Sequence, residues 1–139
     1  METEALAVGQ TFERTFLASD DKVRAFADVS EDRNPVHLDE EAGAKSLFKG
    51  RIAHGMLLGA FISATLGENL PGPGSIYLAQ TLEFTHPVRI GDTVTVRVEV
   101  LSLERSRAVI QTQAFVGAQM VCKGEATVVP PRRRKAVEA

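Results

Sequence analysis

The fold of this chain is decided by one stretch, Gly55-Met-Leu-Leu-Gly-Ala-Phe-Ile-Ser-Ala-Thr-Leu-Gly-Glu-Asn-Leu70. The stretch predicts a helix that is apolar on every side. A helix without a polar face has no side for water, so the rest of the chain must wrap it. Its apolar run, 56–66, is far shorter than the roughly 18 residues of a membrane span and contains Ser63 and Thr65. We therefore expect a buried central helix and no membrane partner.

The sequence that follows the helix predicts only strands. Pro71-Gly-Pro-Gly74 ends the helix. The valines at alternate positions of 93–103 are typical of a strand with one buried face. Short turns at Gly91-Asp92 and Gly117-Ala118 favour an antiparallel meander of the last three strands. The predicted strands are 76–84, 93–103, 108–116 and 119–129.

The segment before the central helix predicts one strand and two helices. Residues 8–17 form a short strand, and Ser19 then caps a helix of about ten residues. After a loop around Asn34-Pro35, Asp39 caps a short helix that continues through Lys45. The apolar stripe of the first helix consists of Val23, Phe26, Ala27 and Val29.

This order of elements predicts an α+β fold in which an antiparallel sheet curls around the central helix. The chain has 139 residues, which fits a single domain, here 1–131. A basic tail at 132–139 is expected to be disordered. Because a curled sheet leaves open edges that can pair with another strand, we expect a homodimer.

Composition excludes several classes of function. The net charge of −2 gives no reason to expect nucleic acid or an anionic membrane as a partner. The single cysteine, Cys122, excludes a disulfide within the chain and has the setting of a small buried hydrophobe. Three scattered histidines give no zinc spacing, and there is no Gly-rich phosphate loop, so we expect no metal and no cofactor. The N-terminus lacks the features of a signal peptide, which indicates a cytoplasmic protein.

The candidate chemistry lies in residues 28–39, Asp-Val-Ser-Glu-Asp-Arg-Asn-Pro-Val-His-Leu-Asp. Asp32 and His37 would lie about 140° apart on a helix and on opposite faces of a strand. Their convergence therefore needs a turn, which Pro35 and the side chain of Asn34 supply. The alternative is an ordinary turn whose exposed acids are merely solvated.

Most of the chain resembles the MaoC-like, or R-specific, enoyl-CoA hydratases of the hot-dog fold superfamily. The resemblance implies a hot-dog fold, a homodimer, and reversible hydration of trans-2-enoyl-CoA to (R)-3-hydroxyacyl-CoA in fatty acid metabolism. Glu31 departs from it, since many relatives have glycine there. The residues that carry the resemblance are Ala27, Ser30, Asp32, Asn34-Pro35, His37, Asp39, Gly50 to Met56, Ser63, Phe84, Pro87-Val88 and Gly91-Asp92-Thr93.

The resemblance places the catalytic pair on Asp32 and His37 and the oxyanion donor on the backbone N–H of Gly55. The residues support this independently, because a helix start favours negative charge and glycine lets a thioester oxygen approach closely. Alternatively, Gly55 only lets the chain turn into the helix. We expect Asp32 to act as the base and His37 to hold the water, although a coupled pair leaves this order open.

Two further side chains are expected to orient the site. Asn34 would fix the loop, and Ser63 would orient a catalytic group or the thioester, unless its hydroxyl bonds the carbonyl of Gly59. His54 precedes the helix, where it could cap or bond locally. The acyl chain would lie between the helix and the strand near Phe84. Candidate cations for the phosphates of a CoA or acyl-carrier-protein arm are Lys45, Lys49, Arg51, Arg89 and Arg105.

Other functions remain open at this point. A dehydratase would run the same reaction in reverse, on acyl-CoA or on an acyl group held by a carrier protein. A thioesterase is a more distant alternative, because a fold does not determine a function. A non-catalytic acyl-binding subunit is the third, but it would have little use for both Asp32 and His37.

Overall fold

The computed structural model describes residues 6–131. The predicted basic tail at 132–139 lies outside the described residues. Within the described part of the chain, no helix is both long and apolar enough to cross a membrane.

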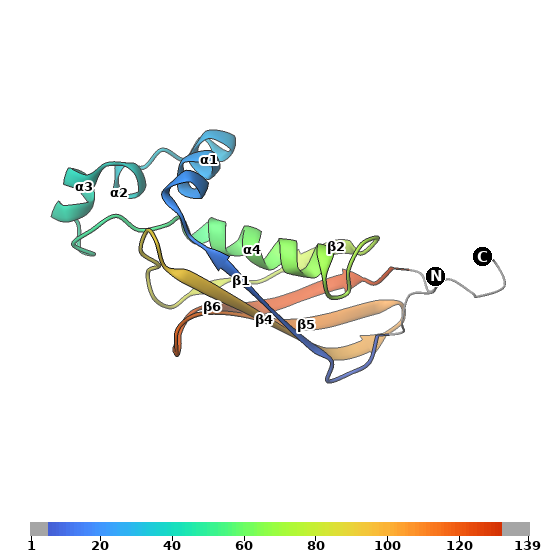
Figure 1. The fold of residues 1–139 in the computed structure, drawn as a ribbon. Helices are drawn as coiled ribbons and strands as arrows, with labels where there is room; N and C mark the ends of the chain where they lie inside the picture. Colours follow the sequence, from blue (N-terminus) through green and yellow to red (C-terminus); the bar gives the residue numbers. More distant parts are fainter. Residues whose placement is uncertain (1–5, 132–139) are drawn as a thin grey trace.

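A single antiparallel sheet of six strands curls around helix α4 (Gly55–Glu68), as Figure 1 shows. The strand order is β1-β4-β5-β6-β2, and β3 also pairs with β6. The expected α+β hot-dog arrangement is confirmed, and so is the meander of the last three strands. The strands are β1 (Thr11–Leu17), β2 (Ile76–Gln80), β3 (Glu83–Phe84), β4 (Thr93–Glu104), β5 (Arg107–Val116) and β6 (Gln119–Val129).

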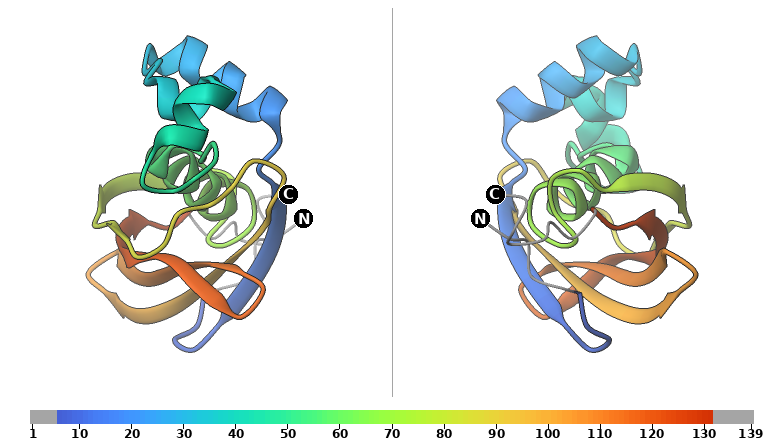
Figure 2. Two further views of the ribbon diagram at one scale, coloured as in Figure 1. Left: turned by 90° about the vertical axis from the view of Figure 1, so that its left-hand side faces the viewer. Right: turned by 90° about the vertical axis from the view of Figure 1, so that its right-hand side faces the viewer.

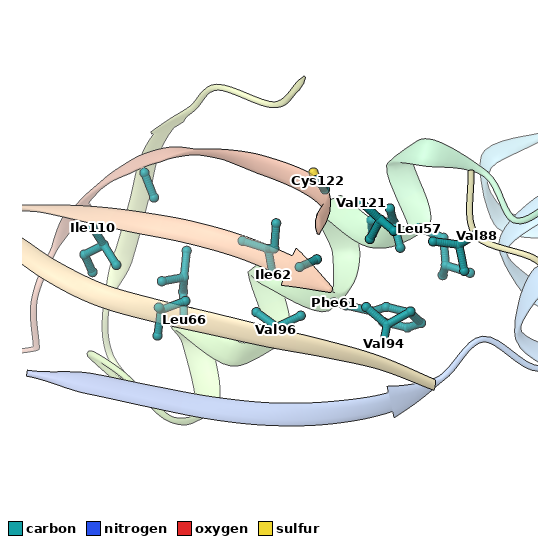
Figure 3. Packing of buried hydrophobic residues seen from close by; sticks show 14 of the residues in the cluster. Leu57, Phe61, Ile62, Leu66, Val88, Val94, Val96, Ile110, Val121 and Cys122 are labelled. Carbon is teal, nitrogen blue, oxygen red and sulfur yellow. The ribbon is translucent and has the colours of Figure 1, made fainter. Parts of the chain in front are cut away.

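The core lies between α4 and the concave face of the sheet. The alternating valines of β4 are fully buried on that face, and polar residues between them point outward. Leu57, Ile62 and Leu66 of α4 belong to the same buried cluster as Val94 and Val96 of β4 (Figure 3). Cys122 lies in the same core, where burial raises the pKa of its thiol to about 11, as expected of a structural cysteine.

The expectation that α4 is wrapped on every side is wrong for the single chain. Met56 is 57% exposed, and Ala60 and Gly67 are exposed on the same side of the helix. One sheet can cover only the side of the helix that it faces. An exposed apolar stripe therefore runs along α4.

The predicted strand 76–84 is interrupted at Thr81, which separates β2 from β3. The carbonyl oxygen of Thr81 lies so close to Gly124 of β6 that a Cβ there would be only 1.8 Å away. The N–H of Thr81 donates to the carbonyl of Glu125, and its hydroxyl accepts from the N–H of Glu125, both at 2.9 Å. The chain thus crosses closely over a glycine, which strand periodicity alone does not reveal.

Three short helices precede α4: α1 (Asp20–Ser30), α2 (Pro35–Leu38) and α3 (Glu40–Lys45). The predicted caps are confirmed, since Ser19 accepts from the N–H of Lys22 and Asp39 accepts from the N–H of Ala42. Helix α2 was not expected, but a proline at the first helical position fits a helix start. Val29 is 81% exposed, so its place in the apolar stripe of α1 was wrong.

Helices α1 to α3 lie beyond the N-terminal end of α4 (Figures 1 and 2). Two backbone hydrogen bonds fix the segment that enters α4. The N–H of Ile52 donates to the carbonyl of Val36 at 3.3 Å, and the N–H of Ala53 donates to that of Val88 at 2.7 Å. The loop between α1 and α2 is thereby held over the start of the central helix.

Candidate active site

The loop that carries Asp32 is shaped by short-range hydrogen bonds at the end of α1. The Ser30 hydroxyl donates to the carbonyl of Phe26 at 2.6 Å and accepts from the N–H of Asp32 at 3.1 Å. Glu31 between them has a φ of 66°, the left-handed conformation that favours glycine at the end of a helix. The chain therefore turns sharply at Glu31 and presents Asp32.

Asn34 links Asp32 to α2. Its N–H donates to Oδ1 of Asp32 at 3.3 Å, and its own Oδ1 accepts from the N–H of Val36 at 3.2 Å. Asn34 is thus the N-cap of α2. These bonds support the predicted orienting role, which stays a prediction.

His37 is buried and held at three points. Its Nδ1 lies 2.8 Å from the carbonyl oxygen of Ile52. A carbonyl only accepts, so Nδ1 carries the hydrogen and Nε2 of the neutral ring is left with a free lone pair. The Nε of Arg51 donates to the carbonyl of His37 at 2.8 Å, and the ring of His54 stacks on the imidazole.

The surroundings of His37 favour its neutral form. Burial is the largest effect and lowers the pKa of the imidazole below its ordinary value of 6.5. The bond to Ile52 and the charge of Asp32 raise the pKa, and the proximity of His54 lowers it further. Near neutral pH, Nε2 of His37 can therefore accept a proton.

His54 lies beside His37, although the sequence predicted for it only a cap or a local hydrogen bond. It makes no side-chain cap on α4. Instead, its Nε2 lies 2.9 Å from the backbone oxygen of Asp32, and its ring lies 3.9 Å from that of His37 with an interplanar angle of 27°. The sequence signal was its position directly before Gly55, but the contact spans 22 residues and appears only in the fold.

One carboxylate oxygen of Asp32 and one ring nitrogen each of His37 and His54 lie within 4.8 Å of one another. One water with hydrogen bonds of about 2.8 Å to two groups can bridge up to about 5.6 Å. The separation between the carboxylate of Asp32 and the imidazole of His37 thus leaves room for one bridging water, and the shared water itself stays a prediction. The in-plane lone pairs of two stacked rings run side by side, a poor arrangement for one metal ion. The expectation of no metal stays a prediction.

Gly55 is the first residue of α4, where backbone N–H groups have no acceptor within the helix. A Cβ on Gly55 would lie 3.2 Å from three carbons of the Phe84 ring. The glycine therefore also permits the close approach of Phe84, a reason that the sequence did not indicate. Its role as oxyanion donor stays a prediction.

An apolar cavity of about 380 Å³ opens beside Gly55. It lies where the acyl chain was expected, between α4 and the strand near Phe84. Its lining residues are Phe48, Ile52, Ala53, Gly55, Leu58, Phe84, Thr85, His86, Pro87 and Val88.

Ser63 lies two helical turns beyond Gly55 on α4. Eight residues along a helix place it about 12 Å from Gly55 along the axis. Thr65 makes a back-bond of the kind considered for Ser63, since its hydroxyl donates to the carbonyl of Phe61, four residues back, at 2.9 Å. The role of Ser63 in orienting a catalytic side chain or the bound thioester stays a prediction.

The structure narrows the candidate phosphate contacts. Arg51 is buried, and its guanidinium donates to Asp20 at 2.5 Å. This bond, followed by that from Arg24, lowers the pKa of Asp20. Arg89 donates to the carbonyl of Phe48 at 2.6 Å. Arg51 thus has a structural role, which argues against phosphate binding.

Comparison with known proteins gives consistent matches. A 3-hydroxybutyryl-CoA dehydratase of Methylorubrum extorquens is 47% identical over 96% of this chain and 86% of its own length. An (R)-specific enoyl-CoA hydratase of Rhodospirillum rubrum is 46% identical, covering 94% and 92%. Among solved structures, the unliganded R-hydratase PhaJ1 of Pseudomonas aeruginosa superposes with a TM-score of 0.88 at 49% identity, over 91% of this chain and 83% of that one.

The model of the MaoC like domain matches residues 4–121. This range includes the Asp32 loop, the whole of α4 and most of the sheet. The chain therefore belongs to the MaoC-like domain family.

Proposed function

We propose that this protein is a hydro-lyase that adds water to trans-2-enoyl-CoA and forms (R)-3-hydroxyacyl-CoA, in a reversible reaction that needs no cofactor. The observation that carries the proposal is the approach of Asp32 and His37 to within 4.8 Å, beside an apolar cavity that begins at Gly55. The names of the relatives from Rhodospirillum rubrum and Pseudomonas aeruginosa support the reaction class and the stereochemistry.

The geometry supports a division of labour between the three groups. A water that donates one hydrogen to the Asp32 carboxylate and the other to Nε2 of His37 directs its oxygen lone pair toward the β-carbon. Attack forms the new C–O bond at the β-carbon and moves the double-bond electrons toward the thioester oxygen. The N–H of Gly55 donates to that oxygen while it carries negative charge.

The reaction is completed by one proton transfer in each direction. Asp32, with His37 as partner, takes a proton from the attacking water, and the pair returns a proton to the α-carbon. Water is consumed, and the site regains its starting protonation state. Because the same steps run backwards, the geometry equally serves dehydration, and the Methylorubrum extorquens relative is named for that direction.

A direct test uses crotonyl-CoA as substrate. Hydration removes the ultraviolet absorbance of the conjugated thioester without releasing free thiol. Release of thiol would instead indicate a thioesterase. The absence of both signals would indicate a non-catalytic acyl-binding subunit. Oxidation of the product by an S-specific, but not an R-specific, 3-hydroxyacyl-CoA dehydrogenase would refute the stereochemical part.

The same assay separates CoA from carrier-protein substrates. Crotonyl groups on CoA and on acyl-carrier protein are compared at equal concentration, and we expect the CoA thioester to have the higher kcat/KM. A preference of at least tenfold for the carrier-bound group would replace the CoA assignment. A series of enoyl-CoA chain lengths then measures the depth of the cavity.

The expected homodimer is part of the proposal. The edge strand β2 exposes three apolar side chains, Ile76, Tyr77 and Leu78. Helix α4 exposes a further apolar surface, the stripe that includes Met56. Joining two β2 edges would pair their backbone groups and reduce this exposure. A monomeric mass in light scattering would refute the dimer. The cytoplasmic location stays a prediction, testable by cell fractionation.

A further inference from the structure

We propose that His54 is a positioning residue for both catalytic side chains. Its Nε2–H fixes the loop that carries Asp32, and the face of its ring fixes the imidazole of His37. The inference rests on the proposed hydration and adds a residue to it. His54 would touch neither the substrate nor the reacting water; it would act through Asp32 and His37.

The first contact fixes the loop of Asp32. Nε2 of His54 lies 2.9 Å from the backbone oxygen of Asp32, which can only accept, so Nε2 carries the hydrogen. Asp32 itself is exposed and its loop contains the left-handed Glu31. The hydrogen bond from a side chain that is only 1% exposed ties this exposed loop to the start of α4.

The second contact fixes the ring of His37. The two imidazoles stack at 3.9 Å, and the bond from Nδ1 of His37 to Ile52 sets the rotation of the ring in its own plane. Stacking restricts the remaining tilt, which determines where Nε2 of His37 points. The Phe26 ring also packs against His54, in a T-shaped arrangement with ring centroids 5.0 Å apart.

Two substitutions separate these contacts. In His54→Gln the amide nitrogen is as many bonds from Cα as Nε2 of histidine, so the bond to Asp32 can be kept while the ring is lost. In His54→Phe the ring is kept and the donor is lost. We expect each to lower kcat about tenfold or more, with KM changed less than about threefold, because misplacement of reacting groups by about 1 Å can cost about 10²-fold in rate.

The matched control is Phe26→Leu, which loosens the packing of His54 but leaves both of its contacts to the catalytic groups. We expect its kcat to stay within about twofold of the wild-type value. A similar loss of kcat in all three variants would show that general packing, and not positioning, is measured, and would overturn the proposal. Wild-type kcat in both His54 variants would do the same.

The acid limb of the pH profile of kcat/KM gives a readout that packing alone would not move. Among the described residues, the titratable groups that act on His37 are His54, whose proximity lowers its pKa, and Asp32, whose charge raises it. Removal of His54 should therefore shift the acid limb to higher pH in both the Gln and the Phe variant, but not in Phe26→Leu. An unchanged limb in both would contradict the proposal.

The wild-type protein offers a test that needs no variant and no activity. Nitrogen NMR of the histidine rings should show His54 protonated on Nε2 and His37 protonated on Nδ1 near neutral pH. Protonation of His54 on Nδ1 alone would overturn the positioning role even in an active enzyme. If crotonyl-CoA is not hydrated but these tautomers are found, the proposed function fails and the contacts assigned to His54 stand.

Discussion

Replacement of Asp32 by asparagine is the most direct test of the chemistry. The asparagine amide oxygen can still accept the hydrogen bond that Asn34 donates to Asp32 Oδ1 at 3.3 Å. The bond from His54 goes to the backbone oxygen and is not touched by the change. The variant therefore removes the charge and the proton-accepting ability of residue 32 and leaves its loop in place.

The expected loss follows from the role of the carboxylate. General acid–base groups contribute about 10²- to 10⁴-fold, and each factor of ten corresponds to about 1.4 kcal/mol of activation free energy. Asp32→Asn should therefore lower kcat/KM for crotonyl-CoA by about 10²-fold or more, or about 3 to 5.5 kcal/mol. The free energy of unfolding should change by less than about 0.5 kcal/mol, because the residue is exposed and its bond is kept.

Two controls make this result interpretable. Asp32→Ala also loses the bond from Asn34, so its activity should fall equally while its stability falls by about 0.5 to 1.5 kcal/mol. Asp28→Asn removes an exposed carboxylate of the same helix–loop region and should retain wild-type kcat/KM. An Asp32→Asn enzyme with more than about a tenth of the wild-type kcat/KM would refute the acid–base role of this residue.

Three further predictions concern titration and backbone. Because burial lowers the pKa of His37, the acid limb of kcat/KM should have its midpoint below pH 6.5. The stability that the buried neutral imidazole contributes is present above pH 6.5 and is lost as the pH falls through the lowered pKa of His37. Glu31→Gly should raise the free energy of unfolding by about 1 kcal/mol in urea denaturation, whereas Glu31→Ala, equally strained at a φ of 66°, should not. Gly124→Ala should lower that free energy by about 2 to 4 kcal/mol, because its Cβ displaces Thr81. Gly67→Ala, whose Cβ meets nothing within 4 Å, should instead raise it by up to about 1 kcal/mol, and equal effects of the two changes would refute the steric account.

The sequence predicted the long-range architecture well where periodicity was strong. Helix α4 and strand β4 have patterns that only a helix or a half-buried strand can satisfy, and both formed. The break at Thr81 was missed because it depends on a close crossing over Gly124, which lies 43 residues away in the chain. Local propensity carries no information on such a contact. The exposure of Met56 was missed because a pattern shows that a helix is apolar, not how much of it one sheet can cover.

The candidate site could be predicted to the extent that its residues are close in sequence. Asp32, Asn34 and His37 lie within six consecutive residues, and Pro35 among them indicated a turn that could bring Asp32 and His37 together. His54 was given no distant contact, because a histidine before a helix is most simply explained as a cap. Its bond to Asp32 forms only once the segment before α4 has been placed against α2.

The site depends on reciprocal bonds between two short segments of the chain, each of which uses the backbone of the other. His37 donates to the carbonyl of Ile52, Arg51 donates to the carbonyl of His37, and His54 donates to the carbonyl of Asp32. The first segment carries the proposed water-activating pair, and the second runs directly into the helix start that is the proposed oxyanion site. The two segments cannot shift relative to each other without breaking several bonds. The proposed positions for the water and for the thioester oxygen would therefore be fixed relative to each other before the substrate binds. Such preorganisation reduces the entropic cost of reaching the transition state. Substitutions of the side chains that donate to these carbonyls should therefore affect kcat more than KM.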